Sequence, residues 1–244
     1  MPRTGLDKPA YFNVIQENVL TVMNAKNNQY YQEIINSASL CVPDGLPLVW
    51  AHEAKKAGLK KNVRGPELMR RYLQHSVGRG VKHFFYGGTP EILSKMVNEF
   101  EKIYPGIKIA GSHAPPYRDL TAEEDANICR KINASEADIL WVSLGGFKQD
   151  AWMYEHRDKI KVKVMHGVGQ AFSINAGIIS EAPKLLQNNG LEWLYMLIMN
   201  PCRLFKRYIF NNPLFIAHVF LEITGLRKYP CVDGQREAGR DSSA

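Results

Sequence analysis

The sequence predicts an α/β fold in which a mostly parallel sheet is flanked by helices and followed by a helical, basic C-terminal appendage. Three observations predict it. Short β-rich runs alternate with segments of helical period between about residues 39 and 165. Capping signals mark the starts of several of these helices. From Glu181 onward the alternation stops, and the chain becomes aromatic, basic and helical.

Five runs are predicted as strands because their residue types favour extended backbone. They are Ser39–Val42, Lys82–Tyr86, Ile107–Ala110, Asp138–Val142 and Lys161–Met165. No strand is predicted before Asn18, where the pattern shows only the polar triplet Gln16-Glu17-Asn18. Strands that alternate with helices pair in parallel with helices on their faces, so a Rossmann-like sheet is expected.

Helix starts support the same alternation. Pro66 and Pro90 occupy first-turn positions, where the missing N–H of proline is tolerated. Thr89 can cap the helix that begins at Pro90, and Thr121-Ala-Glu-Glu124 has the spacing of a capping box. These signals are independent of the strand pattern and strengthen the α/β prediction.

The length of 244 residues favours one main domain with a small addition. We expect an α/β domain over 1–180, a helical appendage over 181–230 and a polar, disordered tail over 231–244. Two interpretations of the appendage stay open. One is a helical hairpin packed on the sheet with solvated charges, and the other is a segment whose aromatic side chains enter a lipid interface while Arg and Lys meet anionic lipid; the two are compatible.

Composition narrows the classes of partner. The formal charge of +7 and the pI of about 9.2 favour nucleic acid, a phosphate-bearing substrate or an acidic lipid surface. Four dispersed cysteines and seven dispersed histidines predict neither a metal site nor a disulfide framework, and no cofactor is expected. The first residues lack the apolar core of a signal peptide, so a cytoplasmic location is expected.

Asp44 is the first candidate catalytic residue. In an open parallel sheet, ligands bind beyond the carboxyl ends of the strands, and Pro43-Asp44-Gly45 directly follows a predicted strand. A turn is one reading, because these residue types supply turn dihedrals easily. The other is a carboxylate directed into the cleft, where it accepts a proton from an attacking hydroxyl.

Glycine-rich turns follow three other predicted strands. Gly87 and Gly88, before a Thr-Pro helix start, could bring backbone N–H groups close to a diphosphate, or could simply permit a tight turn. Gly167 and Gly169 are similar, but Phe172 stands where a dinucleotide fingerprint needs its third glycine. An NAD-type oxidoreductase is therefore poorly supported.

Gln149 is the second candidate catalytic residue. It opens a predicted helix after a glycine pair, so its amide could point into the cleft. No Asp-x-Asp occurs in the chain, although metal-dependent nucleotide-sugar transferases commonly use that motif to hold an ion on the diphosphate. Backbone amides and cationic side chains are expected to stabilise a leaving diphosphate instead.

Seven motifs, in order and in register from about residue 18 to 230, resemble the WecG/TagA/CpsF family of glycosyltransferases. They are Pro43-Asp44-Gly45-Leu-Pro-Leu-Val-Trp50, Val63-Arg-Gly-Pro-Glu-Leu68, Phe85-Tyr-Gly-Gly88, Gly146-Phe-Lys-Gln149, Gly167-Val-Gly-Gln-Ala-Phe172, Ala182-Pro-Lys184, and Gly190-Leu-Glu-Trp-Leu-Tyr195 with Pro201-Cys-Arg203. The resemblance implies an inverting transferase that moves a sugar from a UDP-sugar to a saccharide on undecaprenyl diphosphate. N-acetylmannosamine or a related hexose is the implied sugar.

The same resemblance implies roles for individual residues. Asp44 matches the family's proposed base and Gln149 its glutamine, while Asn18, Arg64 and Gln170 are expected to bind substrate. The family's motif has an arginine where this chain has Asn62, so Arg64 is expected to take its place. The appendage, with Arg203 and Arg207, is expected to reach the lipid diphosphate.

The expected partners are a UDP-sugar donor, a polyprenyl-diphosphate-linked acceptor and an anionic membrane surface, at the inner face of the plasma membrane. Assembly into a homo-oligomer is left open. A non-catalytic nucleotide-sugar or lipid-binding protein is the alternative function. Nucleic acid is not expected as a partner, because only the pI favours it.

Overall fold

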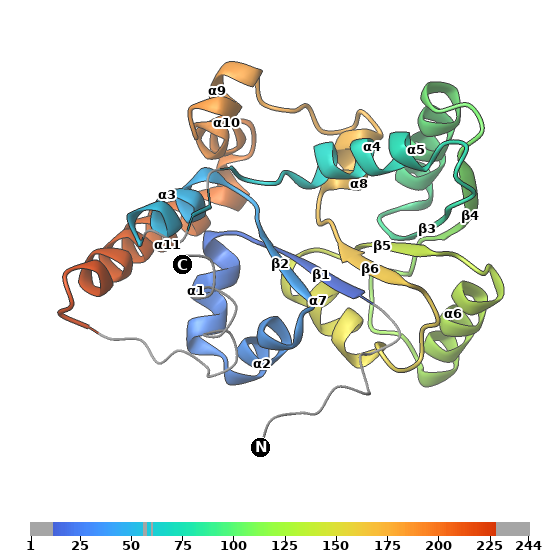
Figure 1. The fold of residues 1–244 in the computed structure, drawn as a ribbon, viewed down its shortest axis with the longest axis horizontal. Coiled ribbons are helices and arrows are strands. Elements are labelled where there is room, and N and C mark those ends of the chain that lie inside the picture. Colours follow the sequence, from blue (N-terminus) through green and yellow to red (C-terminus); the bar gives the residue numbers. More distant parts are fainter. Residues whose placement is uncertain (1–11, 56–57, 60, 228–244) are drawn as a thin grey trace, which may run out of the picture.

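The computed structural model describes residues 12–55, 58–59 and 61–227; the tail predicted over 231–244 lies outside them. Six parallel strands form one sheet in the order β2-β1-β6-β5-β3-β4 (Figure 1). The strands are β1 (Phe12–Glu17), β2 (Leu40–Pro43), β3 (Lys82–Gly87), β4 (Lys108–His113), β5 (Ile139–Ser143) and β6 (Val164–Gly167). The predicted α/β class with a parallel sheet is confirmed.

The strand that the sequence pattern missed is β1. It lies inside the sheet, between β2 and β6, and pairs in parallel with both. Its sequence, Phe-Asn-Val-Ile-Gln-Glu, mixes polar residues among its apolar ones, yet Asn13 and Gln16 are buried along with Val14 and Ile15. The prediction that no strand precedes Asn18 was wrong because tertiary burial, rather than a clean apolar run, holds this segment in the sheet.

Eleven helices occur in the described part of the chain. They are α1 (Val19–Asn27), α2 (Gln29–Ser37), α3 (Leu46–Ala54), α4 (Gly65–Ser76), α5 (Pro90–Ile103), α6 (Ala122–Ala134), α7 (Gly146–Glu155), α8 (Ala171–Asn175), α9 (Lys184–Asn188), α10 (Glu192–Met199) and α11 (Pro201–Ile223). The predicted cap of α5 is confirmed, since Thr89 accepts from the backbone N–H of Ile92. The capping box of Thr121 and Glu124 at α6 is also present.

The core has two layers, one on each face of the sheet. Consecutive strand residues point to opposite faces, so Leu140 packs in the layer with α2, α6 and α7, whereas Trp141 packs in the layer with α4, α5 and α8. Both side chains are almost fully buried. Packing of helices on both faces of the sheet fixes the positions of the strands. It therefore also fixes the positions of the residues that follow the carboxyl ends of the strands.

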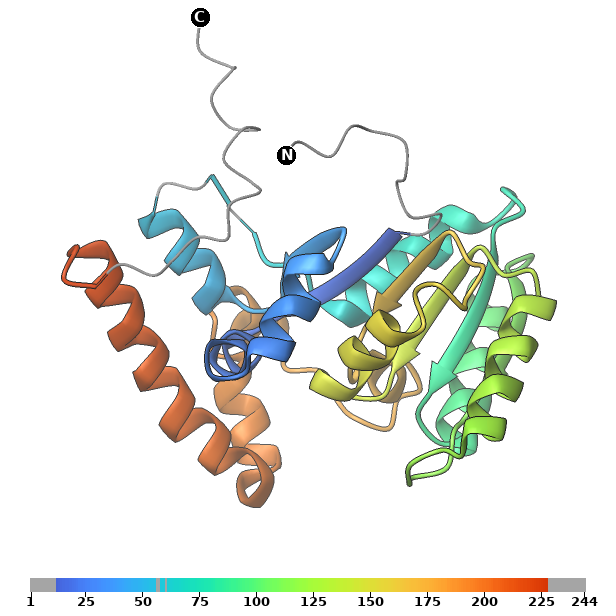
Figure 2. The ribbon, with the colours of Figure 1, turned by 90° about the horizontal axis from the view of Figure 1, so that it is seen from below.

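The long helix α11 lies against α1 and α3 (Figure 2). Phe215 is buried there with Met23 of α1 and Leu48 of α3. Much of the rest of α11 is exposed and apolar, including Phe205, which is 54% exposed, and Phe220, which is 61% exposed. Among the described residues, no helix combines the length and the apolar character that crossing a membrane requires.

Candidate active site

A cleft of about 310 Å³ opens where the carboxyl ends of β1, β2 and β6 meet the helices of the C-terminal region. Residues of α10 and α11 contribute to its lining. Of the residues expected from the sequence, the cleft brings together Asn18, Asp44, Arg64, Gln149, Gly169 and Gln170. This position is the one that parallel α/β sheets use for ligands.

Asn18 and Asp44 occupy neighbouring strand ends. Glu17 and Pro43 are register partners in the β1–β2 pair, so the residues that follow them emerge side by side. The backbone N–H of Asp44 donates to the carbonyl of Glu17 over 2.6 Å, which closes this corner. The Asn18 side chain accepts from the N–H groups of Leu20 and Thr21 and caps α1. Both residues line the cleft in a fixed position.

Gln149 is a buried support of the loop after β6. It is 3% exposed, and its Oε1 accepts a hydrogen bond from the N–H of Gly169 at 3.0 Å. Gly169 has a φ of +52°, a conformation that favours glycine. Gln149 therefore holds the segment that presents Gly169 and Gln170 to the cleft.

The other predicted glycines do not line this cleft in the described part of the chain. A Cβ on Gly87 would lie 2.2 Å from the carbonyl oxygen of Ser143, and one on Gly167 would lie 2.8 Å from Met153. Gly88 has a φ of +67° in the turn before α5. Close packing and turn geometry account for these three glycines, so their predicted contact with substrate is not supported by their position.

Arg64 lies at the cleft but its guanidinium is engaged. The side chain is 9% exposed and donates to both carboxylate oxygens of Glu192, at 3.0 and 2.6 Å, and to Glu181 at 3.1 Å. Gln187 accepts from the same guanidinium at 2.9 Å. Arg64 thus ties the start of α4 to the segment that carries α9 and α10. The side chains of Arg203 and Arg207 lie outside the described part of the chain, so their expected role is not tested.

Comparison with known proteins identifies the family. The family model described as "Glycosyl transferase WecG/TagA/CpsF family" matches residues 4–229. The chain belongs to this family of glycosyltransferases. The predicted resemblance is confirmed, and the dinucleotide-dependent oxidoreductase is set aside.

Two curated relatives have the same printed name, N-acetylglucosaminyldiphosphoundecaprenol N-acetyl-beta-D-mannosaminyltransferase. The protein from Bacillus spizizenii is 27% identical over 216 residues, which cover 88% of this chain and 81% of that protein. The protein from Staphylococcus aureus strain MW2 is 31% identical over 187 residues, which cover 77% of this chain and 72% of that protein.

Sequence reasoning missed several polar residues of this glycosyltransferase's cleft, among them Gln16 and Tyr31. Gln16 is 7% exposed and stands two residues before Asn18, so recognising β1 as a strand would have found it. Tyr31 is 1% exposed and comes from α2. No local signal marks it, because only the packing of α2 on α7 brings it to the cleft.

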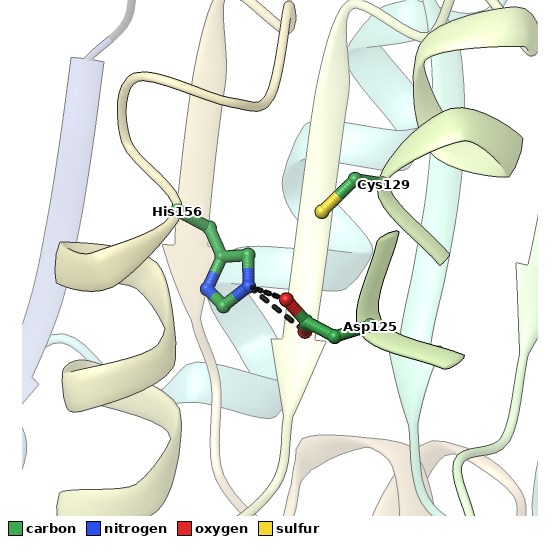
Figure 3. A group of neighbouring side chains, drawn as sticks. All are labelled: Asp125, Cys129 and His156. Atoms are coloured by element: carbon green, nitrogen blue, oxygen red, sulfur yellow. Dashed lines mark hydrogen bonds and ion pairs between the residues drawn. The ribbon is translucent and has the colours of Figure 1, made fainter. Parts of the chain in front are cut away.

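A group away from the cleft has residue types that can bind metal: Asp125, Cys129 and His156 (Figure 3). His156 Nε2 lies 2.9 and 2.8 Å from the two oxygens of Asp125, and its Nδ1 lies 2.7 Å from the carbonyl of Trp152. Both ring nitrogens therefore lie at hydrogen-bond distance from oxygen atoms. Lys159 Nζ lies 3.8 Å from the same carboxylate. These contacts join α6 to the end of α7 in the glycosyltransferase.

Proposed function

We propose that this glycosyltransferase moves a sugar, N-acetylmannosamine or a related hexose, from a UDP-sugar to a saccharide carried on undecaprenyl diphosphate, with inversion at the anomeric carbon. The product would serve cell-surface polysaccharide or teichoic-acid synthesis. One observation carries the proposal: Asn18 and Asp44 stand side by side in a cleft at the carboxyl end of the sheet. The printed names of the relatives supply the substrate class.

Asp44 is the proposed general base. Its carboxylate takes the proton of the acceptor hydroxyl, the hydroxyl oxygen forms a bond to the anomeric carbon, and the bond from that carbon to the UDP oxygen breaks. UDP leaves with the bonding electron pair. The loop of Gly169 and Gln170 lines the same cleft, and because the N–H of Gly169 is bonded to Gln149, the N–H groups of Gln170 are the ones suited to stabilise the leaving diphosphate.

Activity on a panel of substrates tests the function. Radiolabelled UDP-sugars incubated with undecaprenyl-type acceptor lipids should give labelled lipid with one donor of the N-acetylmannosamine class. A non-catalytic nucleotide-sugar or lipid-binding protein is the alternative; it would bind the UDP-sugar in calorimetry and transfer nothing.

Arg64 is proposed to hold the appendage over the cleft rather than to bind UDP. Substituting Arg64→Ala removes the buried cation from Glu192 and leaves Glu181 with Arg70. Because both carboxylates are partly exposed, we expect a loss of about 2 kcal/mol in the free energy of unfolding, less than for a fully buried ion pair. Urea unfolding measures it. Arg71→Ala is the matched control, because Arg71 is on the same helix but 71% exposed and paired only with Glu67. An effect of Arg64→Ala no larger than that of the control would contradict this role.

The appendage is proposed to rest on the inner face of the plasma membrane. Five exposed apolar residues of α11 recur at spacings of four, seven, four and three residues, which places them on one stripe of the helix: Phe205, Ile209, Ile216, Phe220 and Ile223. The buried Phe215 packs against α1 and α3 and lies outside this stripe, whose five residues are exposed. A stripe of this kind is suited to enter the headgroup region of a bilayer.

Assembly of the glycosyltransferase into a homo-oligomer stays a prediction. Light scattering coupled to size-exclusion chromatography measures it directly.

A further inference from the structure

A buried pair of acidic side chains lies beside the cleft: Tyr31 of α2, which lines it, and Asp150 of α7. The Tyr31 hydroxyl oxygen lies 2.7 Å from Asp150 Oδ2, and each residue is 1% exposed. Tyr31 lines the cleft, and so does Gln149, the residue that precedes Asp150. The mechanism proposed above uses neither member of this pair.

Asp150 has only one of its two oxygens satisfied. Oδ2 meets Tyr31, but Oδ1 is buried and has no hydrogen-bond partner among the described residues. A buried carboxylate normally receives several donors, and leaving one of its charged oxygens unpaired is costly. A neutral carboxyl fits this environment better, because its proton can sit on Oδ2 and bond to the Tyr31 oxygen. A separation of 2.7 Å between two oxygens suits a hydrogen bond in either direction.

The groups around Asp150 favour the same state. Burial raises the pKa of Asp150 to about 7, against the hydrogen bond of Tyr31 and the nearby amide of Gln149, and Glu17 of β1 raises it further. Cys41 of β2 also faces Asp150, and its own thiol pKa is raised mainly by burial. Burial raises the pKa of the Glu17 carboxyl, whereas a hydrogen bond from Cys41 and the charge of His52 of α3 lower it. None of the groups acting on Asp150 in the described part of the chain is a cation.

We propose that Asp150 is a positioning residue: its neutral carboxyl donates a hydrogen bond to the Tyr31 oxygen, so that the Tyr31 hydroxyl directs its own hydrogen into the cleft and donates a hydrogen bond to a diphosphate oxygen of a substrate. The inference rests on the proposed function. Diphosphate oxygens only accept hydrogen bonds. If Asp150 were ionised, it would accept the hydrogen bond of the Tyr31 hydroxyl, and a lone pair of the tyrosine would face the anion.

Tyr31→Phe tests the hydroxyl. We expect kcat/KM to fall by roughly ten- to a hundredfold, the range for one hydrogen bond to a charged group in an enclosed site. Tyr30→Phe is the matched control, because the hydroxyl of Tyr30 bonds to exposed Glu155 and lies outside the cleft lining. Weaker binding of the UDP-sugar in calorimetry would identify the donor diphosphate as the contact. Normal donor binding with a raised KM for the acceptor lipid would identify the lipid diphosphate. Equal kcat/KM for Tyr31→Phe and the control would overturn the proposal.

Asp150→Asn and Asp150→Leu test the proton on the carboxyl. Wild-type kcat/KM should fall as the pH rises through about 7, where Asp150 ionises. Asp150→Asn should lack that decline, because its amide remains a donor at every pH. Asp150→Leu should lower kcat/KM at least tenfold at every pH tested. A wild-type decline that persists in Asp150→Asn would overturn the proposal.

Thermal unfolding gives a readout that needs no activity. The folded pKa of Asp150 is raised above the ordinary value of 3.8 for an aspartate, so the folded state holds a proton that the unfolded state releases. Wild-type stability should therefore decline between about pH 4 and pH 7. Over this range, the Tm of Asp150→Asn minus the Tm of the wild type should increase. Parallel Tm curves would overturn the proton assignment. Lack of turnover by every form would refute the proposed function instead, while the Tm comparison would still report on Asp150.

Discussion

The Asp44→Asn variant is expected to lose roughly 10²- to 10⁴-fold in kcat, the range that a general base contributes to an enzymatic rate. Asparagine keeps the size of the side chain but cannot accept the proton of the acceptor hydroxyl at neutral pH. Because the corner is held by the backbone bond from Asp44 to Glu17, the fold around it should survive. Steady-state kinetics with the UDP-sugar and the acceptor lipid measure the change.

Asp158→Asn serves as the control for Asp44→Asn, because Asp158 is 85% exposed and does not line the cleft. The UDP-sugar should bind the Asp44 variant with nearly unchanged affinity, since the base acts on the acceptor. Loss of donor binding would assign Asp44 to the nucleotide, and a kcat equal to that of the control would refute the base.

Removing the exposed apolar stripe of α11 is expected to release the protein from membranes. The triple substitution Phe205→Ser, Ile216→Ser and Phe220→Ser exchanges three side chains that are 54%, 65% and 61% exposed for small polar ones. Burying a side chain of this size in an apolar phase contributes about 1.5–3 kcal/mol, so even partial insertion predicts a loss of more than a hundredfold in partitioning. Co-sedimentation with liposomes containing anionic lipid measures it.

The control for the stripe is Ile103→Ser, which changes an apolar residue of α5 that is 58% exposed. This variant should pellet like the wild type. Substitution is preferable to deletion of the residues after about 200, because Phe215 packs with α1 and α3 and its loss would disturb the core. A triple variant that pellets as well as the wild type would contradict docking through α11.

The pattern of strands and helix caps predicted the α/β class, because these signals are local. The strand-end rule also predicted Asp44 correctly as a residue of the cleft, since parallel strands bring their carboxyl ends together. It did not separate glycines that line the cleft from glycines that only permit close packing, as at Gly87 and Gly167. That distinction depends on neighbours from other strands.

Contacts between distant segments could not be predicted. The partners of Arg64 are 117 to 128 residues away in the chain, and Tyr31 and Asp150 are 119 residues apart. The sequence around Arg64 does not predict that two carboxylates of the C-terminal region pair with its guanidinium. The strand β1 was missed for a related reason, because its polar side chains become buried only when the sheet forms around them.

Transfer of labelled sugar to lipid tests the central claim most directly. Wild-type protein and Asp44→Asn are incubated with a radiolabelled UDP-sugar of the N-acetylmannosamine class and an acceptor saccharide on undecaprenyl diphosphate, and the lipid product is isolated. The expected result is a product of inverted anomeric configuration from the wild type and almost none from the variant. Binding of the UDP-sugar without transfer across a panel of donors and acceptors, or equal product from both proteins, would contradict it.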